Sequence, residues 1–130
     1  MKKINLACII DDDPIHVFGT KKIMQLANIC QDFMVFHNGE EALRKLSALV
    51  KGGENIPEVI LLDLNMPIMD GWEFLEAFTK IPTQRKVHIY IVSSSLSVDD
   101  INRAKNMKNV NNYIIKPIAL EYIKEIVNDL

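Results

Sequence analysis

The sequence is poor in the residues that would mark a disulfide-rich, strongly charged or membrane-spanning protein. Among its 130 residues are only two cysteines, and its 15 basic and 17 acidic side chains nearly balance, giving a formal net charge of −2. A charge so near neutral gives no support for binding nucleic acid or a membrane by electrostatics alone. Any partner must therefore be argued from a particular site, on a chain long enough for one domain with its own core.

Neither the cysteines nor the amino-terminal segment predicts export. Cys8 and Cys30 have neither CxxC nor metal-ligand spacing, so we expect reduced core residues in a cytoplasmic protein. The opening MKKINLACIIDDD has two lysines and a short apolar segment, 4–10, but this segment contains Asn5 and runs into three aspartates. We expect neither a secretion signal here nor a membrane span elsewhere in the chain.

Five short apolar runs, rich in β-branched and aromatic residues, predict β-strands over residues 4–10, 33–36, 59–62, 87–92 and 112–115. Most of them do not alternate between apolar and polar residues, which is typical of a parallel sheet covered on both faces. Segments with helical spacing follow each run, over residues 14–28, 40–50, 70–78, 97–105 and 120–130. Strand and helix alternating five times predict one α/β domain over residues 1–130, with an open, doubly wound parallel sheet.

A carboxylate, hydroxyl or ammonium side chain follows four of the five predicted strands, and this is the strongest functional signal in the sequence. In an open parallel sheet, ligands bind beyond the carboxyl ends of the strands, where the strand order reverses. Only the second strand ends without such a group, at His37-Asn38-Gly39. The residues that follow the other four are Asp11, Asp12 and Asp13, then Asp63, then Ser93, Ser94 and Ser95, and finally Lys116 and Pro117.

Carboxylates gathered at one edge of a sheet need compensation, because like charges a few ångströms apart raise one another's pKa. A hard divalent cation supplies it, and Mg²⁺ is commonly held by one or two carboxylates plus a phosphate oxygen. The expected ligands are Asp12 and Asp63, Asp11 directly or through water, and the backbone carbonyl of Asn65.

Such a site suits phosphoryl transfer, in which positioning and charge neutralisation do most of the catalysis. Asp63 would be the nucleophile and would become an aspartyl phosphate. Lys116 would place a positive charge at the phosphoryl oxygens, and Ser93 would donate a hydroxyl hydrogen bond.

Four segments of the sequence, IIDDDP, VILLDLNMPIMDGWEF, YIVSSS and NYIIKP, resemble in order and spacing the receiver (phosphoacceptor) domain of bacterial two-component response regulators. The resemblance covers essentially the whole chain, and the single-domain, chemotaxis-regulator-like members are the most similar. It implies a flavodoxin-like fold with five helices and strand order 2-1-3-4-5. It also implies roles for individual residues: the acidic pair Asp11 and Asp12, the phosphorylated Asp63, the switch hydroxyl Ser93, the invariant Lys116 and the rotating aromatic Tyr113.

By this resemblance the chain is a signalling switch and not an enzyme with a separate substrate. A sensor histidine kinase or a phosphotransfer protein would supply the phosphoryl group, and the domain would catalyse its own phosphorylation and dephosphorylation at Asp63. The Ser93 hydroxyl would move toward the phosphoryl group and Tyr113 would turn into the vacated space. The surface of the last two predicted helices and the last strand would then change its affinity for a downstream protein. We expect no direct nucleic-acid binding and no membrane binding by this domain.

Other residues near the predicted site have ordinary structural explanations. Asp13 suits the first turn of a helix because of the helix dipole, and Asp70 can cap the third helix. Trp72 is expected to pack near the rim of the site, where it would serve as a fluorescent reporter. Ser95 is a loop residue by default, although in the resembling family its position and that of Asn65 tune dephosphorylation. The three histidines have no ligand spacing, and a place for His16 at the border of the site is a weaker hypothesis.

Two other functions remain open from the sequence. A phosphatase of the haloacid dehalogenase type also uses a strand-end aspartate with Mg²⁺, but it needs a second aspartate two residues later as general acid, where this chain has Asn65. A phosphorylation-independent interaction module on the same scaffold would bind no Mg²⁺ and accept no phosphoryl group. The expected output is protein binding by a stand-alone receiver, while the cognate kinase, the downstream partner, the oligomeric state and the phosphoryl lifetime are not readable.

Overall fold

Five strands form one parallel sheet in the order β2-β1-β3-β4-β5 in the computed structural model, which describes residues 3–83 and 85–130. The strands are β1 (Ala7–Ile10), β2 (Phe33–Phe36), β3 (Val59–Leu62), β4 (His88–Ser93) and β5 (Val110–Ile115). The helices are α1 (Pro14–Leu26), α2 (Gly39–Gly52), α3 (Gly71–Phe78), α4 (Val98–Lys105) and α5 (Leu120–Asn128). Strand order and alternation confirm the predicted flavodoxin-like, doubly wound fold.

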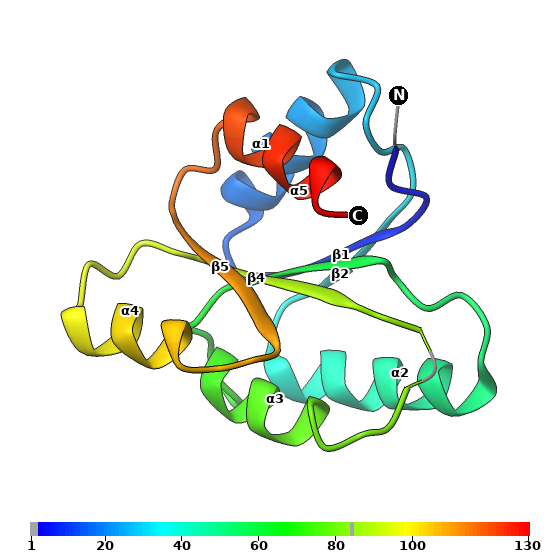
Figure 1. Cartoon of the computed structure of the whole chain (residues 1–130), viewed down its shortest axis with the longest axis vertical. Coiled ribbons are helices and arrows are strands. Elements are labelled where there is room, and N and C mark those ends of the chain that lie inside the picture. The colour runs from blue at the N-terminus through cyan, green and yellow to red at the C-terminus, as the bar shows by residue number, and fades with distance from the viewer. Residues whose placement is uncertain (1–2, 84) are drawn as a thin grey trace.

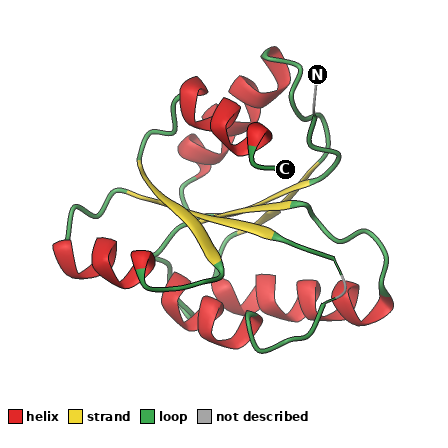
Figure 2. Ribbon diagram, in the orientation of Figure 1, coloured by secondary structure: helices red, strands yellow, loops and turns green. Residues whose placement is uncertain are grey.

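The helices cover both faces of the sheet. Helices α1 and α5 lie on one face and α2, α3 and α4 on the other, as Figure 1 shows, and the strands lie between these two layers (Figure 2). Each face of the sheet has its own hydrophobic core, and the side chains of β1 alternate between them. Ala7 and Ile9 pack toward α1 and α5, while Cys8 and Ile10 pack toward α2 and α3. Because both faces of the central strands are buried, their sequences show no polar alternation.

Polar side chains determine where several helices begin. Asp13 caps α1 by accepting from the backbone N–H groups of Ile15 and His16, and Asn38 caps α2 by accepting from Glu41. Asp70 and Glu73 form a reciprocal capping box at α3, and the Ser97 side chain caps α4. The predicted cap Asp70 is therefore confirmed, and Asp13, expected in the first turn of a helix, is the N-cap of α1.

Several predicted boundaries differ from the structure. Strand β1 begins at Ala7, three residues later than expected, and α1 ends at Leu26 because Asn28 has a positive φ of 56°. Strand β5 begins at Val110, two residues earlier than expected, and its pairing with β4 shifts register between Ile89 and Tyr90. The two exposed asparagines of β5 hid this part of the strand from an apolar-run argument.

The remaining fold-level features concern the cysteines, one proline and the membrane. Cys8 and Cys30 are both free and buried, which confirms their core role. The Lys116–Pro117 peptide bond is cis. Among the described residues, none of the helices combines the length and the apolarity that crossing a bilayer requires.

Gly71 lets the first turn of α3 pack directly against the loop that follows β3. Its N–H donates to the Leu64 carbonyl at 2.8 Å, and a Cβ here would lie 2.5 Å from the Asp63 carbonyl oxygen and 2.8 Å from the Leu64 Cα. These neighbours are backbone atoms, which cannot move aside as a flexible side chain would. The small residue therefore fixes the distance between α3 and the carboxyl end of β3.

We expect Gly71→Ala to lower the free energy of unfolding by about 1–3 kcal/mol, because the added methyl group forces this backbone apart. Gly19→Ala is the matched control: Gly19 lies inside α1 and a Cβ there meets nothing within 4 Å. That variant should gain roughly 0.5–1 kcal/mol from the better helix propensity of alanine. Urea denaturation measures both, and wild-type stability of Gly71→Ala would contradict the close packing.

Candidate functional site

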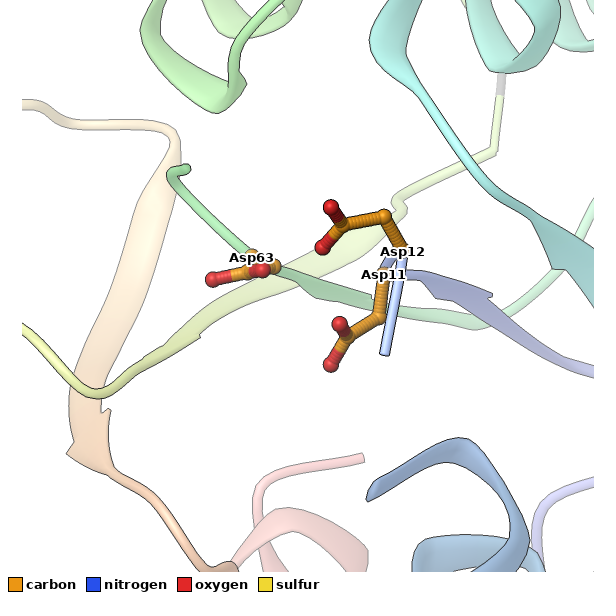
Figure 3. A group of neighbouring side chains, drawn as sticks. All are labelled: Asp11, Asp12 and Asp63. Atoms are coloured by element: carbon orange, nitrogen blue, oxygen red, sulfur yellow. The ribbon is translucent and has the colours of Figure 1, made fainter. Parts of the chain in front are cut away.

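Three carboxylates meet at the carboxyl ends of β1 and β3. Asp11, Asp12 and Asp63 each offer a carboxylate oxygen within 4.8 Å of the others (Figure 3). Asp11 and Asp63 are only 2% and 5% exposed, while Asp12 is exposed. The site therefore has two buried acids and one at its open side, all with the oxygen ligands that Mg²⁺ prefers.

The parallel register of the sheet brings these acids together. Ile10 of β1 pairs with Leu62 of β3, so the next residue of each strand, Asp11 and Asp63, stands at the same edge. The backbone ladder continues one step further, because the Asp63 N–H donates to the Ile10 carbonyl at 2.8 Å. The placement of the two buried acids thus follows from strand pairing and not from a flexible loop.

Lys116 lies between the two buried acids. Its Nζ is 2.9 Å from Asp11 Oδ2 and 3.4 Å from Asp63 Oδ2. Its backbone N–H donates to the Ser93 carbonyl at 2.9 Å, which joins the end of β5 to the end of β4. One ammonium group therefore compensates two carboxylates, and the third remains without a cationic side chain in the ion pairs of the described residues.

The two buried acids differ in their proton affinity. Burial and the negative charge of Asp11 together raise the pKa of Asp63 to about 6, because Lys116 and a hydrogen bond from the Asn65 backbone offset only part of the rise. For Asp11, burial also favours the neutral form, but hydrogen bonds from His16, from the Asp13 backbone and from Lys116 outweigh it and lower the pKa. Burial alone would lower the pKa of Lys116, but the two carboxylates raise it. Asp63 is thus the less stabilised anion of the pair.

Ser93 and Tyr113 lie on the β4 and β5 side of the site. Ser93 is fully buried as the last residue of β4, and its Oγ accepts from the Ser95 backbone N–H at 3.1 Å. The Tyr113 hydroxyl donates to the Ser95 carbonyl at 2.9 Å, so the aromatic ring is tied to the β4–α4 loop. Asn65 is exposed two residues beyond Asp63, and its backbone N–H donates to the Asp63 carboxylate.

Ser95 and Trp72 take part in a network that the sequence did not reveal. The Ser95 Oγ donates to Asp100 at 2.8 Å, and the Trp72 Nε1 donates to the other oxygen of Asp100 at 3.1 Å. The Arg103 guanidinium lies 4.4 Å from the Trp72 ring centroid. Trp72 therefore connects α3 to α4, and Ser95, taken as an ordinary loop residue, connects this network to Tyr113.

His16 is the residue whose role the sequence indicated least well. Its Nδ1 lies 2.8 Å from Asp11 Oδ2, so it directly borders the acidic cluster. The available signal was the N-cap: with Asp13 as the cap, His16 lies in the first turn of α1, where side chains lean back toward the preceding strand end.

Comparison with known proteins agrees with this geometry. The family model of the response regulator receiver domain matches residues 7–128. The chain belongs to this family.

Solved receiver structures and curated relatives support the assignment. A two-component response regulator from Cytophaga hutchinsonii is 30% identical, with a TM-score of 0.88 over 98% of this chain and 97% of that chain. The probable methanogenesis regulatory protein FilR2 of Methanothrix harundinacea is 28% identical over 94% of this chain and 78% of its own length. The receiver domain therefore has relatives of similar size.

A more distant structure shares the fold and carries a metal. The receiver domain of the sensor histidine kinase PA1611 from Pseudomonas aeruginosa PAO1, with a magnesium ion coordinated in its active site cleft, is 17% identical. Its TM-score is 0.76, over 96% of this chain and 95% of that one.

Other curated relatives are much longer: the receiver domain spans 11%, 32% and 43% of a sensor histidine kinase, a protein-glutamate methylesterase and a transcriptional regulator.

The raised pKa of Asp63 predicts a pH-dependent gain in stability for Asp63→Asn. When the pKa of an acid is higher in the folded than in the unfolded protein, the folded state binds the proton more tightly. The free energy of unfolding therefore falls as the pH rises from the unfolded pKa to the folded pKa. These are about 4 for an unfolded aspartate and about 6 here. In metal-free buffer we expect Asp63→Asn to be more stable than wild type by about 1–2 kcal/mol at pH 7.5. Urea denaturation should show the difference shrinking as the pH falls toward 4, and no gain at pH 7.5 would contradict the raised pKa of Asp63.

Proposed function

We propose that this receiver domain, over residues 1–130, is a phosphorylation-dependent switch that accepts a phosphoryl group on Asp63. The observation that carries the proposal is the environment of Asp63, a buried carboxylate beside a second acid and within 3.4 Å of the Lys116 ammonium. Incomplete compensation leaves this carboxylate with electron density for nucleophilic attack. Its place at the end of β3 is the one that the sequence motif indicated.

The donor set fits a divalent cation. Asp12 and Asp63 would hold it, with the backbone carbonyl of Asn65, while the oxygens of Asp11 already accept from protein donors and would reach it through water. When bound, Mg²⁺ supplies positive charge to neutralise the phosphoryl oxygens. The magnesium ion in the PA1611 receiver supports the same assignment here.

The chain's own residues perform the remaining steps. A carboxylate oxygen of Asp63 attacks the phosphorus of a donor phosphohistidine, so that a P–O bond forms, the P–N bond breaks and the leaving imidazole takes up a proton. Lys116 stabilises the negative charge of the transferred group, and the Ser93 hydroxyl donates to one of its oxygens. In dephosphorylation, water attacks the phosphorus of the aspartyl phosphate, the bond between phosphorus and the Asp63 oxygen breaks, and inorganic phosphate leaves as the Asp63 carboxylate is restored. The domain would thus catalyse its own phosphorylation and dephosphorylation.

The conformational response would pass through the β4–α4 loop. Movement of the Ser93 hydroxyl toward the phosphoryl group would break its contact with the Ser95 N–H and release the loop whose carbonyl holds Tyr113. Tyr113 would then change position and alter the surface of α4, β5 and α5. A ligand shifts such an equilibrium by the difference in its affinity for the two states.

The proposed partners are proteins in the cytoplasm. A sensor histidine kinase or a phosphotransfer protein would donate the phosphoryl group, and a downstream protein would bind the altered surface. The presence of a sensor histidine kinase among the curated relatives supports this setting. We propose no direct contact of this domain with nucleic acid or membrane.

Intact mass spectrometry after incubation with Mg²⁺ and acetyl phosphate tests the proposal. Wild type should gain one phosphoryl group, whereas Asp63→Asn, which keeps the size of the side chain, should gain none. The gain should disappear when EDTA replaces Mg²⁺. Uptake by both proteins would place the acceptor elsewhere, and no uptake by wild type in saturating Mg²⁺, nor from a phosphohistidine donor, would favour a phosphorylation-independent binding module.

A further inference from the structure

Asp11 is held by three protein donors at once. Its Oδ2 accepts from Lys116 Nζ at 2.9 Å and lies 2.8 Å from His16 Nδ1, while its Oδ1 accepts from the Asp13 backbone N–H at 2.9 Å. Two of these donors come from the start of α1 and one from the end of β5. Both oxygens of Asp11 are therefore engaged, and the carboxylate has one orientation.

Among the residues that the structure describes, Asp11 is the polar partner toward which the histidine ring is directed. The His16 side chain is only 11% exposed, and its Nε2 is buried without a hydrogen-bond partner among the described residues. A carboxylate accepts hydrogen bonds and does not donate them, so the hydrogen of this contact lies on Nδ1 in either form of the ring. The Asp11 contact is thus the polar interaction that orients His16, and in turn His16 orients Asp11.

We propose that His16 is a positioning residue of the phosphorylation site, an inference that rests on the function proposed above. It fixes the Asp11 carboxylate so that Oδ2 holds the Lys116 ammonium at 2.9 Å, nearer to Asp11 than to Asp63. His16 itself contacts neither the reacting carboxylate of Asp63 nor any other of the assigned metal ligands in the hydrogen bonds of the described residues. Its effect is transmitted through Asp11 alone.

The loss of this donor has a definite consequence for the site. Without it the Asp11 carboxylate keeps the Asp13 N–H and Lys116 as donors but loses one of the two donors to Oδ2, so its orientation is less constrained and Lys116 is held less firmly at 2.9 Å. The ammonium then moves toward Asp63, now 3.4 Å away, and neutralises the carboxylate that should bind the cation and attack phosphorus. Both Mg²⁺ affinity and the rate of phosphorylation should fall, as is usual when a residue that orients a metal site is removed.

The variants His16→Asn and His16→Leu separate the hydrogen bond from packing. The amide Nδ2 of asparagine branches from the same carbon position as the histidine Nδ1, so His16→Asn keeps the donor, whereas His16→Leu fills the space without one. Thr20→Val is the matched control: Thr20 lies one turn further along the same helix, 2% exposed, with an Oγ1 that is likewise unpartnered among the described residues. This change removes a buried polar group without touching Asp11.

Three readouts are measured at one fixed pH. Calorimetry gives the Mg²⁺ dissociation constant, mass spectrometry gives the rate of phosphorylation by acetyl phosphate, and ¹⁵N NMR of the imidazole shows which nitrogen carries the hydrogen. We expect His16→Leu to raise the dissociation constant and lower the rate by about tenfold. For His16→Asn, both the dissociation constant and the rate should stay within about twofold of wild type. Thr20→Val should match wild type, because only the loss of the His16 donor causes the tenfold effect. The wild-type spectrum should show a hydrogen on Nδ1.

The outcomes distinguish this inference from the proposed function. Wild-type behaviour of His16→Leu, or equal losses in His16→Leu and His16→Asn, would overturn the positioning role, the second because packing alone would explain it. A wild type that binds Mg²⁺ with the expected variant pattern but takes up no phosphoryl group would overturn the proposed function and leave the positioning of Asp11 intact. A neutral ring with its hydrogen on Nε2 would contradict the assigned contact directly.

Discussion

Repulsion between the Asp11 and Asp63 carboxylates, compensated in part by Lys116, is the interaction on which the site depends. Two buried acids sharing one ammonium cannot both be fully stabilised, and the difference appears as a raised pKa at Asp63 and a lowered one at Asp11. The asymmetry follows from where the hydrogen-bond donors stand. Asp11 accepts hydrogen bonds from the Asp13 N–H and from His16 at the start of α1. Asp63 has fewer compensating donors, so its carboxylate is the one whose negative charge a cation would stabilise most.

The fold maintains this unfavourable arrangement because the acids stand at the ends of two paired strands whose residues are buried. Asp11 and Asp63 extend from adjacent central strands whose residues are buried on both faces, and Gly71 holds the loop after β3 against α3. Apolar burial in the two cores supplies the stability that offsets the electrostatic cost. The more exposed parts of the site, including Asp12 and the β4–α4 loop, lie where movement costs less.

The sequence was sufficient for the fold and the strand-end residues because both depend on features that a single chain displays. Apolar runs and the polar residues that follow them locate the strand ends, and parallel pairing then places Asp63 beside Asp11. The sequence was insufficient for contacts that depend on how a helix or a loop orients its side chains. The contact of His16 depends on the phase of α1, which is fixed by the Asp13 cap, and the Ser95–Asp100–Trp72 network joins segments that no spacing connects. Likewise, the polar start of β5 carried no apolar signal.

We propose that a divalent cation relieves the repulsion among Asp11, Asp12 and Asp63 at the ends of β1 and β3. Crystals of the wild-type domain grown with Mn²⁺, whose anomalous scattering identifies the ion, test it most directly. We expect one strong anomalous peak in contact with the Asp12 and Asp63 carboxylates and the Asn65 carbonyl, with Asp11 still bound to Lys116. A peak elsewhere, or none at saturating Mn²⁺, would contradict the proposed cation site.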